Sequence, residues 1–357
     1  MKMFLRLLLF PFAILYRGLT GFYHYSYDKG WKPSIEFDLP VISVGNITVG
    51  GTGKTPHIEY LIRLLKDKYS LATLSRGYKR KSKGFLMAGE QSSAKEMGDE
   101  PYQFYAKYGK EIHVAVGEER AMAIPAILNA VEDIQLVLLD DAFQHRKVKP
   151  GLNILLTDYK RPFYDDFLLP AGRLRERRDG AKRADMVIVS KCPDKLPEQE
   201  RAQVSKKIQP YTQPDTPVYF TGLKYTTPCS LKEKDSGESF KNILLLTGIA
   251  HTERLVEDLQ EQYTIVEHLK YRDHAEYTPS LLKSIRTKYQ SLKEKLGDLV
   301  ILTTEKDAVK LQDSSLDTFV SDLPFYYLPI EVYFLQNGEQ FDARVLKYIE
   351  GERSKEA

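Results

Sequence analysis

Short runs of consecutive apolar residues alternate with amphipathic stretches along most of this chain. Apolar runs bounded by turn-forming residues are typical of buried strands. The first such run begins at Val41, and the others lie at 71–74, 112–116, 134–139, 153–157 and 186–190. The stretches 57–68 and 118–130 place apolar residues three or four positions apart, which indicates helices. This alternation predicts an α/β fold with a mostly parallel sheet that carries helices on both faces.

The pattern changes near Pro214, and a second series of the same kind follows. After an extended segment at 217–225 and a polar loop at 232–239, strands are predicted at 242–247, 263–267 and 299–303, with a helix over 279–296. A further extended segment, 325–334, is expected to pair with the one near Val218. The simplest architecture is two α/β lobes joined by paired strands. We therefore expect a larger lobe at 21–215, linker strands and a smaller lobe at 216–335, and a C-terminal helix at 336–357.

The N-terminal segment, 1–20, is unusually apolar. The apolar run 7–16 has Lys2, Arg6 and Arg17 near it, and as a helix it would span about 15 Å, half of a bilayer's hydrocarbon core. A cleavable signal peptide and a buried core helix are alternatives, but no small-residue cleavage site follows the run. We favour a monotopic helix that rests on a membrane surface.

Composition narrows the class of protein. The chain of 357 residues is 42% hydrophobic and 28% charged, which is typical of a globular protein with a substantial core. Its net charge of +3 favours no nucleic-acid partner. Cys192 and Cys229 lie far apart, so neither a disulfide framework nor a zinc site is expected.

A glycine-rich loop follows the strand that begins at Val41. Such a loop turns backbone N–H groups toward phosphates at the start of a helix, and it contains Gly50, Gly51, Gly53, Lys54 and Thr55. Lys54 would reach the β- and γ-phosphates and Thr55 would bind Mg²⁺. Thr48 stands where the usual pattern has its first glycine. The loop predicts a nucleoside triphosphate site.

The strand at 134–139 ends in Asp140 and Asp141. Nucleotide-binding sheets place an Mg²⁺ partner in this way, opposite the lysine and threonine of the loop. Adjacent residues of a strand point in opposite directions, so one of the two carboxylates is expected to bind the metal or its water. The alternative is an ordinary polar loop after a strand.

Other acids and bases have two interpretations on sequence alone. Asp99 and Glu100 precede a predicted helix at 102–108, where an acidic residue is most often an N-cap. Asp273 and His274 follow the strand at 263–267, and either type of side chain can accept a hydroxyl proton during phosphoryl transfer. Three arginines are candidate phosphate clamps, each with an ordinary surface role as the alternative: Arg76, Arg120 and Arg175.

Taken together, the motifs resemble one family. They are Gly-Asn-Ile-Thr-Val-Gly-Gly-Thr-Gly-Lys-Thr-Pro, Ser-Arg-Gly-Tyr, Gly-Asp-Glu-Pro, Leu-Asp-Asp-Ala-Phe-Gln-His-Arg, Leu-Leu-Pro-Ala-Gly-Arg-Leu-Arg-Glu and Thr-Glu-Lys-Asp. In this order, and over nearly the whole chain, they are similar to the tetraacyldisaccharide 4'-kinases, the lipid A 4'-kinases of Gram-negative bacteria. The loop without glycine at position 48 belongs to that family's pattern.

The resemblance implies a P-loop NTPase-like lobe and a smaller lobe, both α/β/α, with a two-stranded linker and ATP between them. It implies transfer of the γ-phosphoryl group of ATP to the 4'-hydroxyl of a tetraacyldisaccharide 1-phosphate, the lipid A disaccharide 1-phosphate. The expected location is the cytoplasmic face of the bacterial inner membrane, with the enzyme peripheral or monotopic and monomeric.

The resemblance also implies residue roles. Catalysis falls to Asp99 as the base for the 4'-hydroxyl, to His274 as its partner, and to Lys54. The remaining ATP-site residues are Asn46, Thr48, Val49, Gly50, Gly51, Thr52, Gly53, Thr55, Arg76, Glu100, Gln144 and Arg175. The expected Mg²⁺ ligands are Thr55, Asp140, Asp141 and Glu176.

Two other classes of protein share the loop. A partition-type ATPase switch carries a lysine just before the glycine pair, where this chain has Val49, and it lacks the Asp99 turn. A membrane-bound nucleotide sensor without transfer activity is the second alternative.

Overall fold

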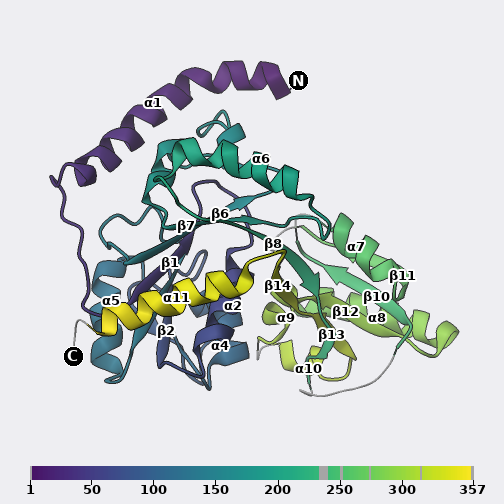
Figure 1. Cartoon of the computed structure of the whole chain (residues 1–357). Helices are drawn as coiled ribbons and strands as arrows, with labels where there is room; N and C mark the ends of the chain where they lie inside the picture. Colours follow the sequence, from purple (N-terminus) through teal and green to yellow (C-terminus); the bar gives the residue numbers. More distant parts are fainter. Residues whose placement is uncertain (1, 233–239, 250–251, 273–274, 314–315, 355–357) are drawn as a thin grey trace.

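The computed structural model describes residues 2–232, 240–249, 252–272, 275–313 and 316–354, which form two sheets with helices around them (Figure 1). The larger sheet has the strand order β14-β8-β7-β6-β1-β5-β2-β4-β3. Its bounds are β1 (Val41–Gly45), β2 (Leu71–Ser75), β3 (Leu86–Met87), β4 (His113–Val116), β5 (Leu136–Asp140), β6 (Leu152–Asp158), β7 (Met186–Ser190), β8 (Val218–Tyr225) and β14 (Ile330–Phe334). The central strands are parallel, as their apolar sequences predict.

Both faces of the larger sheet are covered because successive strand residues point to opposite sides. Ile42 and Val44 of β1 pack in one cluster with three helices, whereas Val41 packs in another with α5 (Arg120–Ala130). The three helices on the first face are α2 (Lys54–Leu65), α4 (Asp99–Tyr108) and α11 (Gly338–Arg353). The C-terminal helix α11 therefore returns to the core of the larger lobe. On the second face a separate cluster includes the end of α6 (Glu198–Ile208).

The smaller sheet has the order β11-β10-β12-β13-β9. Its strands are β9 (Cys229–Ser230), β10 (Asn242–Thr247), β11 (Thr264–Lys270), β12 (Val300–Thr304) and β13 (Phe325–Leu328). Helix α8 (Pro279–Leu296) covers one face, and α7 (Glu253–Gln260) covers the other. Two short helices follow β12, namely α9 (Glu305–Leu311) and α10 (Asp317–Val320). The predicted arrangement of two α/β lobes is confirmed.

The connection between the lobes differs from the prediction in one respect. Segment 325–334 is not one extended strand, because Pro329 separates β13 in the smaller sheet from β14 in the larger one. Proline has no N–H for a strand ladder, so it suits the point where the chain changes sheets. The predicted pairing with the segment near Val218 is correct for β14, which is antiparallel to β8. Since β8 also pairs with β7, both linker strands extend the larger sheet.

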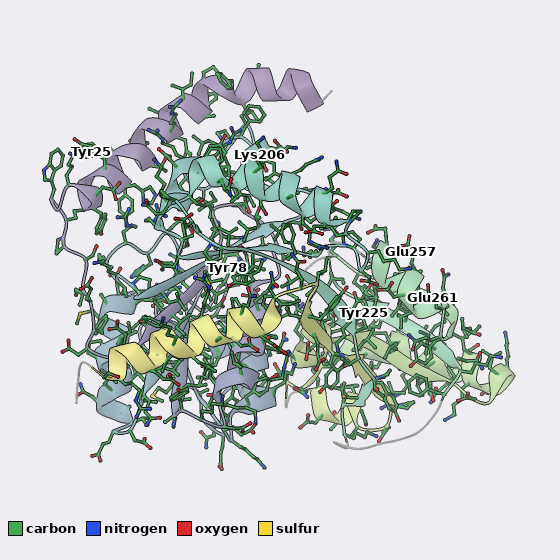
Figure 2. The ribbon with its side chains drawn as sticks, in the orientation of Figure 1. Tyr25, Tyr78, Lys206, Tyr225, Glu257 and Glu261 are labelled. Atoms are coloured by element: carbon green, nitrogen blue, oxygen red, sulfur yellow. The ribbon has the colours of Figure 1, made fainter. Side chains whose placement is uncertain are left out.

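The N-terminal helix α1 (Lys2–Asp28) runs along the outside of the larger lobe (Figure 1). Its apolar side chains are mostly exposed: Leu8, Phe12, Leu15, Leu19 and Phe22 each keep more than 60% of their surface. Tyr25, labelled in Figure 2, projects away from the body of the protein. The alternative of a buried core helix is therefore wrong. Among the described residues, no helix combines the length and apolar character needed to cross a bilayer.

Candidate active site

The glycine-rich loop connects β1 to α2 at the carboxyl edge of the larger sheet. Gly50 has φ +109° and Gly53 has φ +81°, conformations that glycine adopts without strain. Gly53 occupies the N-cap position, so α2 begins at Lys54, earlier than the predicted start at residue 57. The N–H groups of the first turn of α2 therefore follow the glycines directly, and this arrangement suits a phosphate group.

Hydrogen bonds fix the shape of this loop. The Asn46 side chain donates to Thr52 Oγ1 (2.8 Å), and Ser190 Oγ donates to the carbonyl of Thr52 (2.7 Å). The backbone N–H of Val49 donates to the Arg173 carbonyl at 2.7 Å. Between these contacts Thr48 is buried and forms an antiparallel bridge with Leu174. Extended backbone accommodates any residue, which explains why position 48 does not require glycine.

Asp141 lies between two cations. Its carboxylate is 3.6 Å from Lys54 Nζ, and both of its oxygens accept hydrogen bonds from Arg175 Nη1 at 3.0 Å. Arg175 reaches this position because its backbone N–H donates to the Ile47 carbonyl beside the loop (2.8 Å). Lys54, Asp141 and Arg175, three of the predicted site residues, thus lie together in the structure.

Asp140 is in a different environment. It is buried, Oδ2 accepts from Ser75 Oγ (3.1 Å), and Oδ1 is buried without a hydrogen-bond partner among the described residues. Burial raises the pKa of Asp140 to about 7, and the negative charges of Glu100 and Asp141 contribute to the rise. The two adjacent carboxylates therefore diverge as predicted, and Asp140 Oδ1 is the oxygen left without a protein donor.

Arg120 is not an ordinary surface arginine. It is buried, and burial lowers the pKa of its guanidinium to about 10, while the nearby charge of Asp140 acts in the opposite direction. The positive charge of Arg76 contributes to the lowering. Arg76 is itself exposed, just after β2. Arg120 thus belongs to the electrostatic surroundings of Asp140, and Arg76 lies near enough to Arg120 for its charge to act on it.

Glu176 is held by protein donors on both oxygens. Oε1 accepts from Gln144 Nε2 (2.8 Å) and Oε2 from Arg183 Nη2 (2.7 Å), with His24 Nε2 at 3.5 Å. Gln144 Nε2 also donates to the carbonyl of Asn46 at 2.7 Å. Gln144 and Glu176 therefore link the loop to α1, and the role of Glu176 as a metal ligand stays a prediction.

Asp99 is the first residue of α4, and Gly98 (φ +92°) holds the N-cap position. The alternative of Asp99 as the N-cap is therefore wrong. Oδ2 of Asp99 lies 3.9 Å from Lys310 Nζ on α9, so Asp99 faces the smaller lobe. His274, its predicted partner, lies outside the described residues.

Other contacts at the site were not predicted from the sequence. His57 is buried, with Nδ1 2.6 Å from the Gly53 carbonyl and Nε2 3.0 Å from Thr221 Oγ1, and burial lowers its pKa to about 4. Lys191 contacts the carbonyl of Gly51 and lies 3.0 Å from Asp158. Lys191 comes directly after strand β7, at the same edge of the sheet as Asp140, and this position in the sequence could have indicated that it lies near the site. For Lys310, the only feature of the sequence that could have indicated a role at the site is its position just after the Thr-Glu-Lys-Asp motif.

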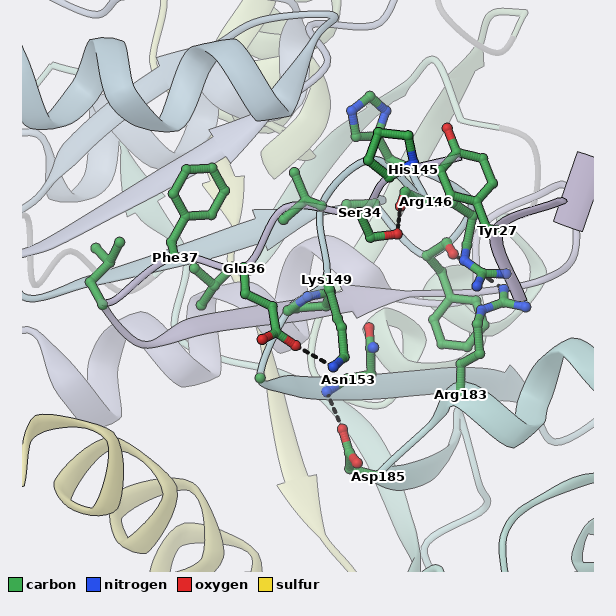
Figure 3. A pocket seen from close by; sticks show the side chains of 18 of the residues that line it. Tyr27, Ser34, Glu36, Phe37, His145, Arg146, Lys149, Asn153, Arg183 and Asp185 are labelled. Carbon is green, nitrogen blue, oxygen red and sulfur yellow. Dashed lines mark hydrogen bonds and ion pairs between the residues drawn. The ribbon is translucent and has the colours of Figure 1, made fainter. Parts of the chain in front are cut away.

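A cavity of about 730 Å³ lies next to this site (Figure 3). It opens between residues 30–41 and the segment 142–153, and none of the predicted site residues lines it. Arg183, which binds Glu176, is part of its wall. The chemistry is therefore expected at the loop and not in this cavity. In the described part of the chain, no three His, Cys, Asp or Glu side chains converge on a common metal position.

Comparisons with known proteins agree on one family. A family model described as tetraacyldisaccharide-1-P 4'-kinase matches residues 5–350. A tetraacyldisaccharide 4'-kinase of Flavobacterium johnsoniae is 47% identical over 97% of both chains, and one of Phocaeicola vulgatus is 43% identical over 96% of this chain and 94% of its own. The solved structure of LpxK from Aquifex aeolicus in complex with ATP is 30% identical, with a TM-score of 0.75 over 97% of this chain and 99% of that one.

Proposed function

This chain belongs to the tetraacyldisaccharide-1-phosphate 4'-kinase family, and we infer that it uses ATP to phosphorylate the 4'-hydroxyl of a tetraacyldisaccharide 1-phosphate in lipid A biosynthesis. The observation that carries this conclusion is the convergence of Lys54, Asp140 and Asp141 at one edge of the sheet, with Asp99 at the boundary with the second lobe. Transfer from ATP to an alcohol needs a cradle for the phosphates, charge neutralisation and a base.

The donor site is the loop from Asn46 to Thr55. Its backbone N–H groups and the start of α2 bind the phosphates, and Lys54 supplies a positive charge to the transferred group. In the structure Asp141 pairs with Lys54 and Arg175. We propose that the incoming phosphates take over these two cations, which frees Asp141.

The residues present fit Mg²⁺. Magnesium prefers oxygen ligands and usually binds one or two carboxylates together with substrate phosphates. Asp140 Oδ1, buried and without a donor among the described residues, is such an oxygen, and Thr55 and Asp141 are the other proposed ligands. When bound, the ion would neutralise charge on the β- and γ-phosphates. Glu176 is the least supported ligand, because both of its oxygens already accept hydrogen bonds.

Asp99 is the proposed base. A sugar hydroxyl is a very weak acid, so its attack on phosphorus benefits from a carboxylate that accepts the proton. Asp99 lies at the N-terminus of α4 and points toward the smaller lobe, as expected for a base that meets the acceptor in the cleft. His274 is retained as its proposed partner.

The two lobes would have different functions. We assign ATP binding to residues 21–215, acceptor contacts to residues 216–335 together with Asp99, and support of the larger lobe to the helix within 336–357. The proposed acceptor is bound to a membrane by its acyl chains. The exposed apolar side chains of α1 support a monotopic contact with the cytoplasmic face of the inner membrane, and Tyr16 connects this helix to the site by donating to the Arg175 carbonyl (2.8 Å). We propose a monomer without a nucleic-acid partner.

Transfer of labelled γ-phosphate from ATP to lipid A disaccharide 1-phosphate in detergent micelles tests this function. We expect Asp99→Asn to lower kcat by about 10²–10⁴-fold, the usual contribution of a general base. Glu111→Gln is the matched control, because Glu111 lies near the other end of α4 in an exposed ion pair with Lys66. A wild-type protein that transfers phosphate only to water would exclude the kinase function. Near-normal transfer by Asp99→Asn would exclude only the base.

A further inference from the structure

Helices α4 and α9 lie side by side across the boundary between the lobes (Figure 1). Two ion pairs join these helices, Lys107 with Glu305 and Asp99 with Lys310, and a third pair, Lys95 with Asp313, crosses the same boundary beside them. The proposed base, Asp99, is therefore part of a charged interface between lobes, and its direct counterpart there is Lys310.

The ammonium group of Lys310 is held in place by its own lobe. The Lys310 side chain is only 11% exposed, Nζ donates to the carbonyl of Ala275 (3.2 Å), and Oδ1 of Asp307 lies at 3.7 Å. Asp307 is fully buried, and its Oδ2 accepts from the Gly248 N–H (2.8 Å) and from Thr304 Oγ1 (2.6 Å). The smaller lobe thus presents a fixed positive charge to the larger one.

Asp99 is the more exposed member of the pair. Its side chain is 27% exposed at the first turn of α4, against 11% for Lys310. An opposite charge 3.9 Å away, on a side chain that is itself mostly buried, attracts the carboxylate and favours the rotamer that points toward it. Because the two charges belong to different lobes, the attraction acts only when the lobes are at the right separation.

We propose that Lys310 is the positioning residue for the Asp99 carboxylate. It orients Oδ2 from the opposite lobe, so the base is aligned only when the α4–α9 contact is formed. Lys310 neither binds the phosphates nor accepts the proton. The proposal rests on the role of Asp99 as the base and adds that a lysine of the second lobe determines its alignment.

Steady-state kinetics of Lys310→Met, Lys310→Arg and the control Lys95→Met test the proposal. Lys95 forms an ion pair across the same boundary, but its partner there is Asp313. We expect Lys310→Met to lower kcat about tenfold with an ATP KM within about twofold of wild type, because misalignment affects the chemical step and leaves the loop intact. Lys310→Arg should recover most of the lost kcat, and Lys95→Met should be unchanged. Lys310→Gln, which can still donate to Ala275, replaces Lys310→Met if that variant is not obtained folded.

An unchanged kcat in Lys310→Met would overturn the proposal. An equal loss in Lys95→Met would also overturn it, since the interface as a whole would then be responsible.

The double variant Asp99→Asn/Lys310→Met separates this inference from the proposed function. If Lys310 acts through Asp99, adding Lys310→Met to Asp99→Asn should change kcat by less than about twofold. A full additional tenfold loss would overturn the positioning role and leave the base assignment intact. Near-normal activity of Asp99→Asn alone would overturn the base itself.

Discussion

The phosphate loop and the α4–α9 contact both depend on charged residues, but they are held together differently. The loop is fixed by short-range geometry: a strand end, glycines at positive φ, and hydrogen bonds to neighbouring strand ends such as Ser190. The α4–α9 contact is made by side chains that belong to different lobes. The donor end of the site is consequently rigid, whereas the alignment of the proposed base depends on how the lobes meet.

The two regions also differ in their buried titratable groups. Beside the loop, His57 is buried in its neutral form, and burial lowers its pKa to about 4. At the α4–α9 contact, Glu59 and Glu305 share the ammonium of Lys107, and burial together with the charge of Glu59 raises the pKa of Glu305 to about 7. The loop region should therefore lose stability in acid, and the interface should lose it as the pH rises.

The largest loss of activity is expected from a substitution in the phosphate loop. Lys54→Met should lower kcat/KM by about 10³-fold, because the charge on the transferred phosphoryl group loses its fixed counterpart. Lys66→Met, at the other end of the same helix, should stay within about twofold, since Lys66 only pairs with Glu111 and Asp67 at the surface. The measurement is kcat/KM for phosphate transfer, determined for both variants and for the wild type. A loss below tenfold in Lys54→Met would exclude its catalytic role.

Lys107→Met should be the most destabilising change at the interface. It leaves Glu59 and Glu305, exposed by only 1% and 7%, without their shared cation, and an uncompensated buried charge costs about 3–5 kcal/mol. Urea unfolding at pH 8 measures this free energy. Lys95→Met removes an exposed pair and should cost no more than about 1 kcal/mol. Equal costs would mean that the buried network contributes nothing of its own.

His57→Gln should make the loop region less sensitive to acid. The unfolded chain binds a proton near pH 6.5 and the folded chain near pH 4, so wild-type stability falls as the pH drops through this range. Between pH 7.5 and 5 the wild type should lose about 2 kcal/mol more than the variant. Gln can still donate to the Gly53 carbonyl, so folding should be retained. Parallel acid sensitivity in the two proteins would show that another group is responsible.

Glu305→Gln should have the opposite and smallest effect. The folded-state pKa of about 7 lies above the unfolded value of 4.5, so the stability associated with Glu305 is fully present below pH 4.5, declines as the pH rises through the folded-state pKa, and then levels off. From pH 6 to pH 8 the wild type should lose about 1 kcal/mol relative to the variant. Thermal or urea unfolding at both pH values detects the difference. The same pH dependence in both proteins would contradict the assignment to Glu305.

Much of the donor site was predictable because its signals are contiguous in sequence. The strand from Val41, the glycines and Lys54 occupy one stretch, and Asp140 is the last residue of a strand that pairs directly with β1. The departure at Thr48 is visible in the motif, and only the resemblance indicates that it belongs to the family's pattern. Its physical reason, an extended bridge to Leu174, needed the structure.

Other features depend on contacts between distant segments. Arg120 and an ordinary surface arginine look alike in the sequence, and only the fold buries Arg120 near Asp140. Pro329 interrupts the apolar run 325–334 in the sequence, but only the fold shows that the two halves pair in different sheets. The exposure of the apolar side chains of α1 likewise depends on how this helix lies against the larger lobe.

The sequence by itself determined the class of fold, the position of the phosphate loop and the family of the enzyme, because local propensity, apolar periodicity and short motifs act over neighbouring residues. Only the tertiary structure decided which charges meet across the lobes. Lys310 lies far from Asp99 along the chain, and nothing in either segment encodes their contact. The reason is physical: an ion pair requires two charges within about 4 Å, and that distance is set by the packing of α4 against α9.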